Sequence, residues 1–413
     1  MPRVESFDIV IVGAGPAGIA AACAAAESGA TTAVLDDNPT PGGQIWRGRK
    51  PPSREAARWI ERLKRTSVRL IHGTTVIAVP EAGRLLAQDA AGAIEIEYRE
   101  LILATGARER FVPFPGWTLP RVLGAGGLQA MTKSGMPIAG KSVVIAGSGP
   151  LLMAVADALR KQGARILAVA EQAPWSKLVP FAPHLLVDFA KLRQAMGIKA
   201  RLLRVPYLAG SWPVCAQDLS DHLHVILQTP RGRRELDCDY LACGFFLVPN
   251  LELATLLGCR LEAQGVVVDD AQRTSVPRVL AAGEATGIGG LDKSLIEGEI
   301  AGFVAAGRSE LAASLVRTRR RSHRFAAALR HAFTLREELK ELPQPDTIVC
   351  RCEDVSYARL ASHASPRDAK LQTRCGMGPC QGRICGPACT FLFDWPDNTP
   401  RPPLYPAPLE NLA

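Results

Sequence analysis

The stretch that decides the fold is Phe7–Asp36, which reads FDIVIVGAGPAGIAAACAAAESGATTAVLD. Phe7–Val12 is an almost entirely apolar run, typical of a strand that is buried on both faces of a sheet. The pattern G-x-G-x-x-G at residues 13–18 follows and opens an alanine-rich helix that is predicted to end at Gly29. Thr31–Leu35 is a second predicted strand, so the stretch predicts a strand–helix–strand unit of the dinucleotide-binding type.

Each glycine of this pattern has a distinct expected role. Gly13 permits a tight turn, Gly15 lets a diphosphate approach the backbone, and Gly18 lets the helix pack closely on the strand. The helix N-terminus then stabilises the diphosphate through its dipole and its free N–H groups. Asp36 ends the second strand and can accept hydrogen bonds from a ribose 2′-OH, which favours FAD or NAD over NADP.

The same pattern starts again in the middle of the chain. A strand at Lys141–Ala146 leads into Gly147-x-Gly149, and a strand that begins at Arg165 ends at Glu171. The last glycine of the pattern is replaced by Leu152, whose bulk is expected to push the helix away from the strand. This second unit therefore either binds an adenine nucleotide at Gly147, Gly149 and Glu171 or is kept only as architecture.

The composition is that of a globular protein with two or three domains. The chain has 413 residues, of which 47% are hydrophobic and 22% are charged. No run approaches the roughly 20 apolar residues of a membrane span, and no signal peptide precedes the first strand, so we expect a cytoplasmic protein. In a reducing compartment, the 11 cysteines are expected to be metal ligands or buried thiols rather than disulfides.

The net charge of +9 is unevenly spread along the chain. Residues 311–343 hold eight Lys and Arg against three Glu, and they are predicted to form a basic helical linker. Such a helix is either a solvated face or a docking surface for an acidic partner, with at most peripheral membrane association. Aromatic residues do not alternate with the charges, which argues against nucleic-acid binding.

Four cysteines near the carboxyl end indicate a metal centre. Cys350-x-Cys352 is followed after 22 residues by Cys375-x4-Cys380, which gives two thiolates to each iron of a [2Fe–2S] cluster. Structural zinc also takes four thiolates, but its paired cysteines are usually spaced more widely than Cys350 and Cys352. Further cysteines at 385 and 389 make this region richer in thiols than one cluster needs, and their roles stay open.

Further glycine-rich segments favour FAD as the nucleotide at the first turn. Pro41–Gln44, Ala104–Gly106, Gly283-Glu284 and Gly287–Gly290 resemble flavoproteins with two dinucleotide-binding domains, such as the thioredoxin- and glutathione-reductase-like enzymes. In that family an Asp holds the flavin ribityl chain, where this chain has Glu284. The resemblance also implies that a helix beginning near Asp292 points its N-terminus at the flavin. The redox-active Cys-x-x-Cys of disulfide reductases is missing.

The resemblance extends further, over about residues 7–395. Segments 41–47, 105–110 and 114–120, together with the cysteine quartet, resemble the FAD subunit of opine oxidases, hydrogen cyanide synthase and heteromeric proline or hydroxyproline dehydrogenases. Residues 373–383 resemble the [2Fe–2S] domain of the bacterioferritin-associated ferredoxin type. The resemblance implies a second, partner subunit of the amino-acid-oxidase-like flavoprotein type, which oxidises an amine, and an external electron acceptor. The substrate and the acceptor are not determined by this chain.

The sequence thus predicts an α/β protein with two Rossmann-like domains and a small helical [2Fe–2S] domain. The predicted segments are an FAD domain at 1–110 and 261–310, an inserted NAD(P)-like domain at 111–260, the linker at 311–343, the [2Fe–2S] domain at 344–395 and a Pro-rich tail at 396–413. The predicted flavin-binding residues are Gly13, Gly15, Pro16, Ala17, Gly18, Asp36, Asp37, Gly43, Gln44, Val76, Ala104, Thr105, Gly106, Gly283, Glu284, Gly289 and Gly290. Gln44, Arg47 and Arg108 are candidates for positions beside the flavin ring.

Two other functions fit parts of the sequence. A self-sufficient NAD(P)H-dependent flavin oxidoreductase would use the turn at Gly147–Gly149, although Leu152 and the missing dithiol argue against it. A regulatory or scaffold protein would use its cluster as a sensor rather than in turnover.

Overall fold

The computed structural model describes residues 3–48, 52–186, 189–396 and 400–412. The chain divides into two compact units, which are described separately. Unit 1 comprises residues 1–108, 249–327 and 399–413, and unit 2 comprises residues 109–248 and 328–398. Two short strands, β7 (Ala107–Glu109) and β16 (Leu247–Pro249), lie where the chain crosses between the units.

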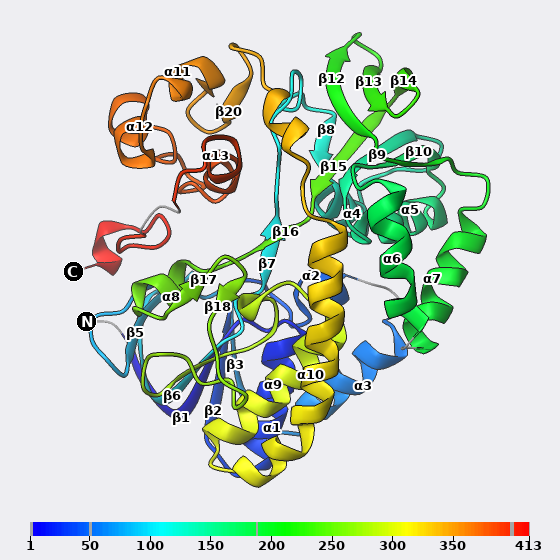
Figure 1. The fold of residues 1–413 in the computed structure, drawn as a ribbon. Helices are drawn as coiled ribbons and strands as arrows, with labels where there is room; N and C mark the ends of the chain where they lie inside the picture. Colours follow the sequence, from blue (N-terminus) through cyan, green and yellow to red (C-terminus); the bar gives the residue numbers. More distant parts are fainter. Residues whose placement is uncertain (1–2, 49–51, 187–188, 397–399, 413) are drawn as a thin grey trace. The chain divides into compact units, whose positions relative to one another are not determined.

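Unit 1 is built on a seven-stranded sheet in the order β3-β2-β1-β6-β5-β4, with β19 paired to β6 (Figure 1). The pairs among β3, β2, β1, β6 and β19 are parallel, and β5 pairs antiparallel with β6 and with β4. The strands are β1 (Arg3–Val12), β2 (Thr32–Asp36), β3 (Arg69–His72), β4 (Thr75–Ala78), β5 (Arg84–Asp89), β6 (Gly92–Leu103) and β19 (Val279–Ala281). The first predicted strand–helix–strand unit therefore forms the centre of this sheet, with β1 between β2 and β6.

The helices of unit 1 are α1 (Pro16–Glu27), α2 (Gly43–Trp46), α3 (Arg54–Lys64), α8 (Glu252–Leu256), α9 (Leu291–Ala305) and α10 (Ser309–Ala332), whose last residues enter unit 2. Short elements complete it: β17 (Leu261–Glu262), β18 (Gly265–Val266), η1 (Gly283–Thr286) and η3 (Leu409–Asn411). α1 and α9 pack backbone to backbone, because a Cβ atom on Gly298 would lie 2.2 Å from the Ala17 carbonyl oxygen. This contact brings the late segment that follows β19 against the first glycine turn.

The carboxyl end of the chain joins the core of unit 1. Leu404 is buried, and its backbone N–H donates to the Ile77 carbonyl at 2.7 Å. The Asn411 side chain donates to Gln88 Oε1 at 3.2 Å. The described part of the Pro-rich tail is thus packed against β4 and β5.

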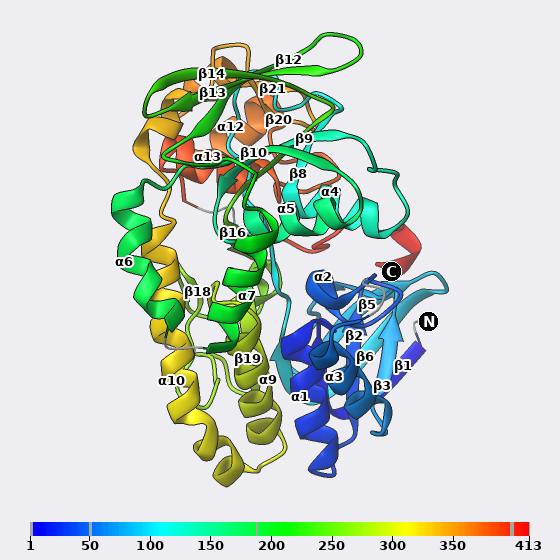
Figure 2. The ribbon, with the colours of Figure 1, turned by 90° about the vertical axis from the view of Figure 1, so that its right-hand side faces the viewer.

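Unit 2 contains a parallel sheet in the order β11-β10-β9-β15-β8. Its strands are β8 (Val122–Gly124), β9 (Ser142–Ser148), β10 (Arg165–Glu171), β11 (Tyr207–Ala209) and β15 (Tyr240–Phe245). Its helices are α4 (Ala125–Lys133), α5 (Leu151–Lys161), α6 (Trp175–Leu186) and α7 (Phe189–Arg201). A separate antiparallel sheet of β12 (Trp212–Asp218), β13 (Leu223–Thr229) and β14 (Gly232–Cys238) lies at one end of the unit (Figure 2).

The cysteine-rich region belongs to unit 2 as well. It contains η2 (Glu337–Glu341), β20 (Ile348–Cys350), β21 (Val355–Ser356), α11 (Tyr357–Ala361), α12 (Pro366–Thr373) and α13 (Cys385–Phe393). Leu335, Leu339 and Leu342 share a hydrophobic core with Trp117 and Phe245, and Trp117 Nε1 donates to the Ile348 carbonyl at 2.5 Å. Residues 328–343 of the predicted linker and the predicted cluster domain therefore belong to one unit with residues 109–248, whereas residues 311–327 of the linker belong to unit 1.

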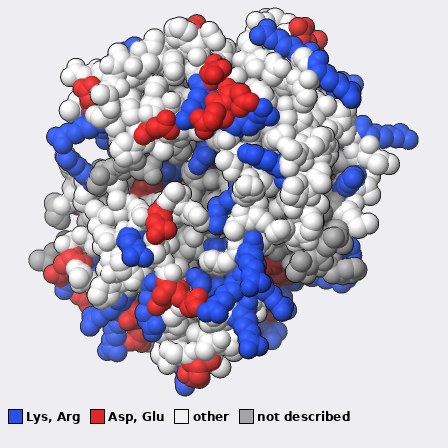
Figure 3. Space-filling view, viewed as in Figure 1, with Lys and Arg blue, Asp and Glu red and all other residues white. Residues whose placement is uncertain are grey.

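Basic side chains gather along α10, as Figure 3 shows in the same view as Figure 1. Arg317, Arg321 and Arg324 are exposed on its surface. Arg319 instead is buried and pairs with Asp270 at 2.6 Å. Only part of the basic sequence is therefore available to a partner. No helix in the described part of the chain is both long and apolar enough to cross a bilayer.

Candidate cofactor sites

The first glycine turn is closely packed against the end of β6. Gly13 has a φ of +108°, and a Cβ atom there would lie 2.3 Å from the Ala104 carbonyl oxygen. A Cβ on Gly18 would lie 1.8 Å from the Gly13 carbonyl oxygen, so α1 approaches β1 in the way that the sequence pattern predicts. A Cβ on Gly15, by contrast, would meet only the Gly43 Cα, at 4.0 Å, among the described residues. The backbone at Gly15 is therefore open to an approaching diphosphate, as a dinucleotide cofactor requires.

Asp36 braces this turn. One carboxylate oxygen accepts the Ala14 N–H at 2.5 Å, and the other accepts the Asn38 N–H at 2.8 Å. Asp37, next along the chain, is exposed. Val76 lies on β4 and is buried. The predicted contacts of these residues with an adenosine group stay predictions.

The segment that follows β6 is held by Asn250, a residue that the sequence analysis did not identify. Thr105 Oγ1 donates to the Asn250 carbonyl at 2.7 Å, and Asn250 Nδ2 donates back to the Thr105 carbonyl at 2.8 Å. Arg108 donates to Asn250 Oδ1 at 2.7 Å and pairs with Glu252 at 2.8 Å. Arg108 is thus engaged in fixing the carboxyl end of β6. The role of Asn250 was missed, because a single Asn after a strand is common in any protein.

Gln44 and Arg47 flank α2 beside the first turn. Arg47 Nη2 donates to Gln44 Oε1 at 3.3 Å. Arg47 Nη1 is buried and has no hydrogen-bond partner among the described residues. A buried donor without an acceptor is uncommon in folded proteins. This unmet donor and the open backbone at Gly15 both fit a polar cofactor bound at the turn.

Glu284 lies in η1, and its carboxylate turns toward the start of α9. It accepts the N–H groups of Gly289 at 3.3 Å and Gly290 at 2.9 Å. Burial raises the pKa of this carboxyl, and these two hydrogen bonds act against that rise. Gly283 lies against α1, because a Cβ there would be 2.7 Å from the Ala17 Cβ. A contact between Glu284 and a flavin ribityl chain stays a prediction.

A buried ion pair behind this turn was also missed. Lys293 is 1% exposed and Glu297 is 0% exposed, and they pair at 2.9 Å. Lys293 Nζ also donates to the Gly283 carbonyl at 2.8 Å and to Thr286 Oγ1 at 2.7 Å. His323 Nε2 contacts the second Glu297 oxygen at 2.6 Å. The sequence signal for this ion pair was weak, because it consists only of a Lys and a Glu four residues apart on one predicted helix.

The second glycine turn, in unit 2, also has the backbone of a dinucleotide site. Gly147 and Gly149 have φ angles of +138° and +107°. Glu171 is 1% exposed, and its carboxylate accepts the N–H groups of Gly149 at 2.7 Å and Ala173 at 2.9 Å. Burial raises the pKa of Glu171 to about 7. Leu152 takes the place in this pattern that Gly18 has in the first one, and its side chain is buried in the core of unit 2.

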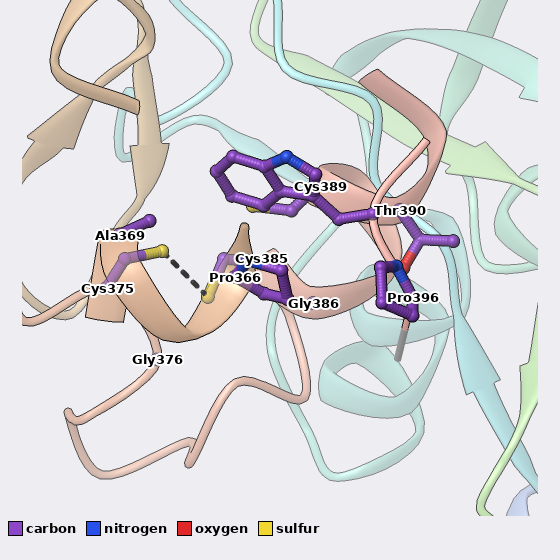
Figure 4. A pocket seen from close by; sticks show the side chains of 10 residues that line it. Pro366, Ala369, Cys375, Gly376, Cys385, Gly386, Cys389, Thr390 and Pro396 are labelled. Atoms are coloured by element: carbon purple, nitrogen blue, oxygen red, sulfur yellow. Dashed lines mark hydrogen bonds between the residues drawn. The ribbon is translucent and has the colours of Figure 1, made fainter. Parts of the chain in front are cut away.

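The thiols near the carboxyl end form a group within unit 2. The Sγ atoms of Cys350, Cys375 and Cys385 lie within 4.8 Å of one another, and Cys375 Sγ donates to Cys385 Sγ at 3.9 Å, the contact dashed in Figure 4. Hydrogen bonds between thiols link Cys380 to Cys385 and to Cys352, which is exposed. Of the four predicted ligands, Cys350 and Cys375 belong to the group of three whose Sγ atoms lie within 4.8 Å, and the assignment of Cys352 and Cys380 as ligands stays a prediction. Cys385 lies at the centre of the thiols, and the spacing Cys380-x4-Cys385 was the sequence signal that could have identified it.

The surroundings of the thiols fit an iron–sulfur cluster. Backbone N–H groups of Gly376 and Glu353 donate to Cys350, and those of Gly382 and Ile384 donate to Cys380. Such bonds stabilise thiolates and the sulfurs of a cluster. A small pocket adjoins the group (Figure 4), lined by Pro366, Ala369, Cys375, Gly376, Cys385, Gly386, Cys389, Thr390, Trp395 and Pro396.

Comparisons with known proteins show the family to which the chain belongs. Residues 7–309 match the family described as pyridine nucleotide-disulphide oxidoreductase. The chain is 33% identical to an opine oxidase subunit from Rhizobium meliloti over 98% of both chains. It is 31% identical to hydrogen cyanide synthase subunit HcnB of Pseudomonas aeruginosa, over 92% of this chain and 91% of that protein.

Among solved structures, the fold is similar to that of L-proline dehydrogenase from P. horikoshii. The TM-score is 0.70 at 18% identity, over 100% of this chain and 80% of the other. T. acidophilum thioredoxin reductase matches with a TM-score of 0.58 at 21% identity, over 74% of this chain and 99% of the other. At this identity the two structures confirm the predicted α/β fold class and carry no statement about substrates.

Proposed function

The chain belongs to the pyridine nucleotide-disulphide oxidoreductase family, and we propose that it is the electron-transfer subunit of a heteromeric dehydrogenase. Within the family it is a flavoprotein oxidoreductase of the group that includes HcnB and the opine oxidase subunit. A partner flavoprotein oxidises a secondary amine or an amino acid, and this chain passes the electrons to an external acceptor. The names of the relatives support a multi-subunit enzyme, since both proteins are described as subunits.

One observation carries the proposal. The same chain holds an open glycine turn suited to FAD and a group of thiols suited to a [2Fe–2S] cluster. When bound, FAD exchanges two electrons and can release them singly, whereas the cluster takes one electron at a time. A pair of such centres suits electron transfer between a two-electron donor and a one-electron acceptor.

The residues of unit 1 have the roles of binding and orienting FAD. The turn at Gly13–Gly18 and the N-terminus of α1 hold the diphosphate. Asp36 fixes the turn and faces the ribose side, while Arg47 offers its unmet donor to the cofactor. The turn that begins at Gly283 is kept in place by the buried ammonium of Lys293.

The cluster ligands divide into two pairs. We pair Cys352 with Cys380, and Cys350 either with Cys375 or with Cys385, whose Sγ atoms both lie within 4.8 Å of Cys350 Sγ. The sequence spacing predicts the pairs Cys350–Cys352 and Cys375–Cys380 instead. The amide N–H groups around Cys350 and Cys380 favour the thiolate forms that bind iron. The proposal sets the protein in the cytoplasm, where a reducing environment keeps cysteine thiols available as metal ligands.

The test is to purify the full chain anaerobically, reconstitute it with FAD, iron and sulfide, and record its visible and electron paramagnetic resonance spectra. Cys380→Ser should remove the cluster signal and leave the flavin bands, whereas Cys23→Ser, a buried thiol of unit 1, should leave both. Co-purification with a second flavoprotein then identifies the partner. A chain that binds FAD and a cluster but receives no electrons from any flavoprotein partner would favour the sensor alternative.

A further inference from the structure

The second glycine turn is covered by the segment Phe333–Arg336, which follows α10 within unit 2. Ser148 Oγ donates to the Phe333 carbonyl at 3.2 Å, and Gln172 Nε2 donates to the Thr334 carbonyl at 3.2 Å. The Arg336 N–H donates to Gln172 Oε1 at 3.2 Å. Ser148 ends β9 and Gln172 follows β10, so these bonds hold the segment at the carboxyl ends of the two strands. In an open Rossmann fold, the ribose and diphosphate of a dinucleotide occupy this place.

Two aromatic rings close the approach to the glycines. Phe246 lies against the turn, because a Cβ atom on Gly149 would be 3.0 Å from Phe246 Cδ2. The rings of Phe246 and Phe333 stack with their centroids 6.4 Å apart, and Phe181 meets Phe333 edge-on at 5.7 Å. Phe333 itself is buried. A diphosphate needs direct access to the backbone here, and these side chains occupy the space on that side.

The polar groups of the turn are already engaged within the protein. The carboxylate of Glu171 accepts the N–H groups of Gly149 and Ala173, and Ser148 Oγ also accepts from Gln172 Nε2 at 2.9 Å. Glu171 is 1% exposed, so its carboxylate does not reach the surface, where a ribose would bind.

The segment is anchored on its far side as well. The Arg336 guanidinium lies over the Trp212 ring, 4.8 Å from the centroid. Leu335 and Leu339 are buried in the core that they share with Trp212. Displacing the segment would therefore expose apolar side chains to water and break its hydrogen bonds to Ser148 and Gln172. Both effects make its replacement by a nucleotide unfavourable.

We propose that Phe333–Arg336 is a built-in plug that excludes NADH, NADPH and other adenine dinucleotides from the second fold. The chain then receives electrons only from a protein partner, although its family is named for pyridine nucleotides. The proposal needs no iron–sulfur cluster, so its failure and the failure of the proposed electron-transfer function are distinguishable.

The test measures binding of NADH and of ADP-ribose to the FAD-loaded full chain by calorimetry, with flavin bleaching by NADH as a second readout. Wild type is expected to show no saturable binding up to about 1 mM, the upper range of ordinary enzyme affinities. The variant Gln172→Ala/Phe333→Ala removes two holds on the plug and is expected to bind ADP-ribose at least about tenfold more tightly than wild type. His331→Ala, an exposed change at the end of α10, is the matched control and should behave as wild type.

Saturable binding to wild type that protects the Gly147–Gly149 amides from hydrogen exchange would overturn the proposal. So would a folded double variant that still fails to bind, because the plug would then not be what excludes the nucleotide. If the double variant does not fold, the hydrogen-exchange result on wild type decides alone: unchanged protection of residues 147–149 and 333–336 with NADH present supports the plug.

Discussion

Replacing Lys293 with Met tests whether the buried ion pair holds the turn beside the proposed flavin site. Methionine has a similar length but no charge, so Lys293→Met would remove the ammonium that pairs with the fully buried Glu297 at 2.9 Å and leave Glu297 with His323 at 2.6 Å and Arg319 at 3.9 Å. The Gly283 carbonyl and Thr286 Oγ1 would each lose a donor at the same time. We therefore expect unit 1 to lose stability and the turn that begins at Gly283 to lose its fixed position.

The magnitude follows from two independent estimates. Breaking a buried ion pair by removing one partner typically costs about 3–5 kcal/mol, because the remaining charge is buried without compensation. Burial raises the pKa of Glu297, but Lys293 and His323 outweigh it and lower the pKa from 4.5 to about 2. A shift of that size corresponds to about 3 kcal/mol. Since His323 supplies part of this stabilisation and stays in the variant, we expect Lys293→Met to cost about 3 kcal/mol.

The assay is urea unfolding of the FAD-loaded chain, followed by the rise in flavin fluorescence that accompanies release from unit 1. Lys64→Met makes the same chemical change at an exposed position of α3 and is the control. The double variant Lys293→Met/Glu297→Gln should cost less than the sum of the single changes, because it leaves no unpaired charge. A Lys293→Met protein within about 1 kcal/mol of the control would refute the reasoning, since an effect this small is typical of exposed pairs.

Three further predictions follow from the same contacts. The depressed pKa of Glu297 means that its stabilisation is complete above its unfolded value of 4.5 and is lost as the pH falls toward about 2, so flavin release should rise over that window in wild type and rise less in Glu297→Gln. Gly18→Ala should abolish FAD binding, because its Cβ would lie 1.8 Å from a carbonyl oxygen, whereas Gly127→Ala, a position of α4 with open space, should change neither the flavin nor the cluster spectrum. Cys375→Ser and Cys385→Ser should differ in the cluster spectrum after reconstitution: the one that loses the signal is the fourth ligand, and loss in neither would contradict the two-pair ligand proposal.

The sequence predicted the first glycine turn well, because its determinants are local. Gly13 needs a positive φ, and Gly18 must lack a Cβ, and both requirements follow from a chain that turns directly from β1 into α1. The same argument predicted the second strand–helix–strand unit and identified Leu152 as its departure from the pattern. The structure adds that the glycine turn before Leu152 is covered by another segment of the same chain, Phe333–Arg336.

The thiol group was predicted in part. Two cysteines separated by one residue must lie close together, so Cys350 and Cys352 were identified from spacing alone. Cys375-x4-Cys380 and Cys380-x4-Cys385 have the same spacing, and the first of them was predicted to hold the cluster. The fold of residues 350–389 brings the Sγ atoms of both Cys375 and Cys385 within 4.8 Å of Cys350 Sγ. The choice of ligands depends on distances in space between segments that are far apart in the chain, and the spacing of the cysteines along the sequence does not give those distances.

The sequence by itself determined the features that neighbouring residues impose on one another: the apolar strands, the glycine turns and the acids that end the second strands. Only the tertiary structure decided that Asn250 holds Thr105, that Lys293 holds Gly283, and that Phe246, which stacks on Phe333, lies against Gly149. These contacts join segments through side chains whose types are common in any protein. Their meaning arises from burial, because a polar group out of water must find its partner wherever the fold places one.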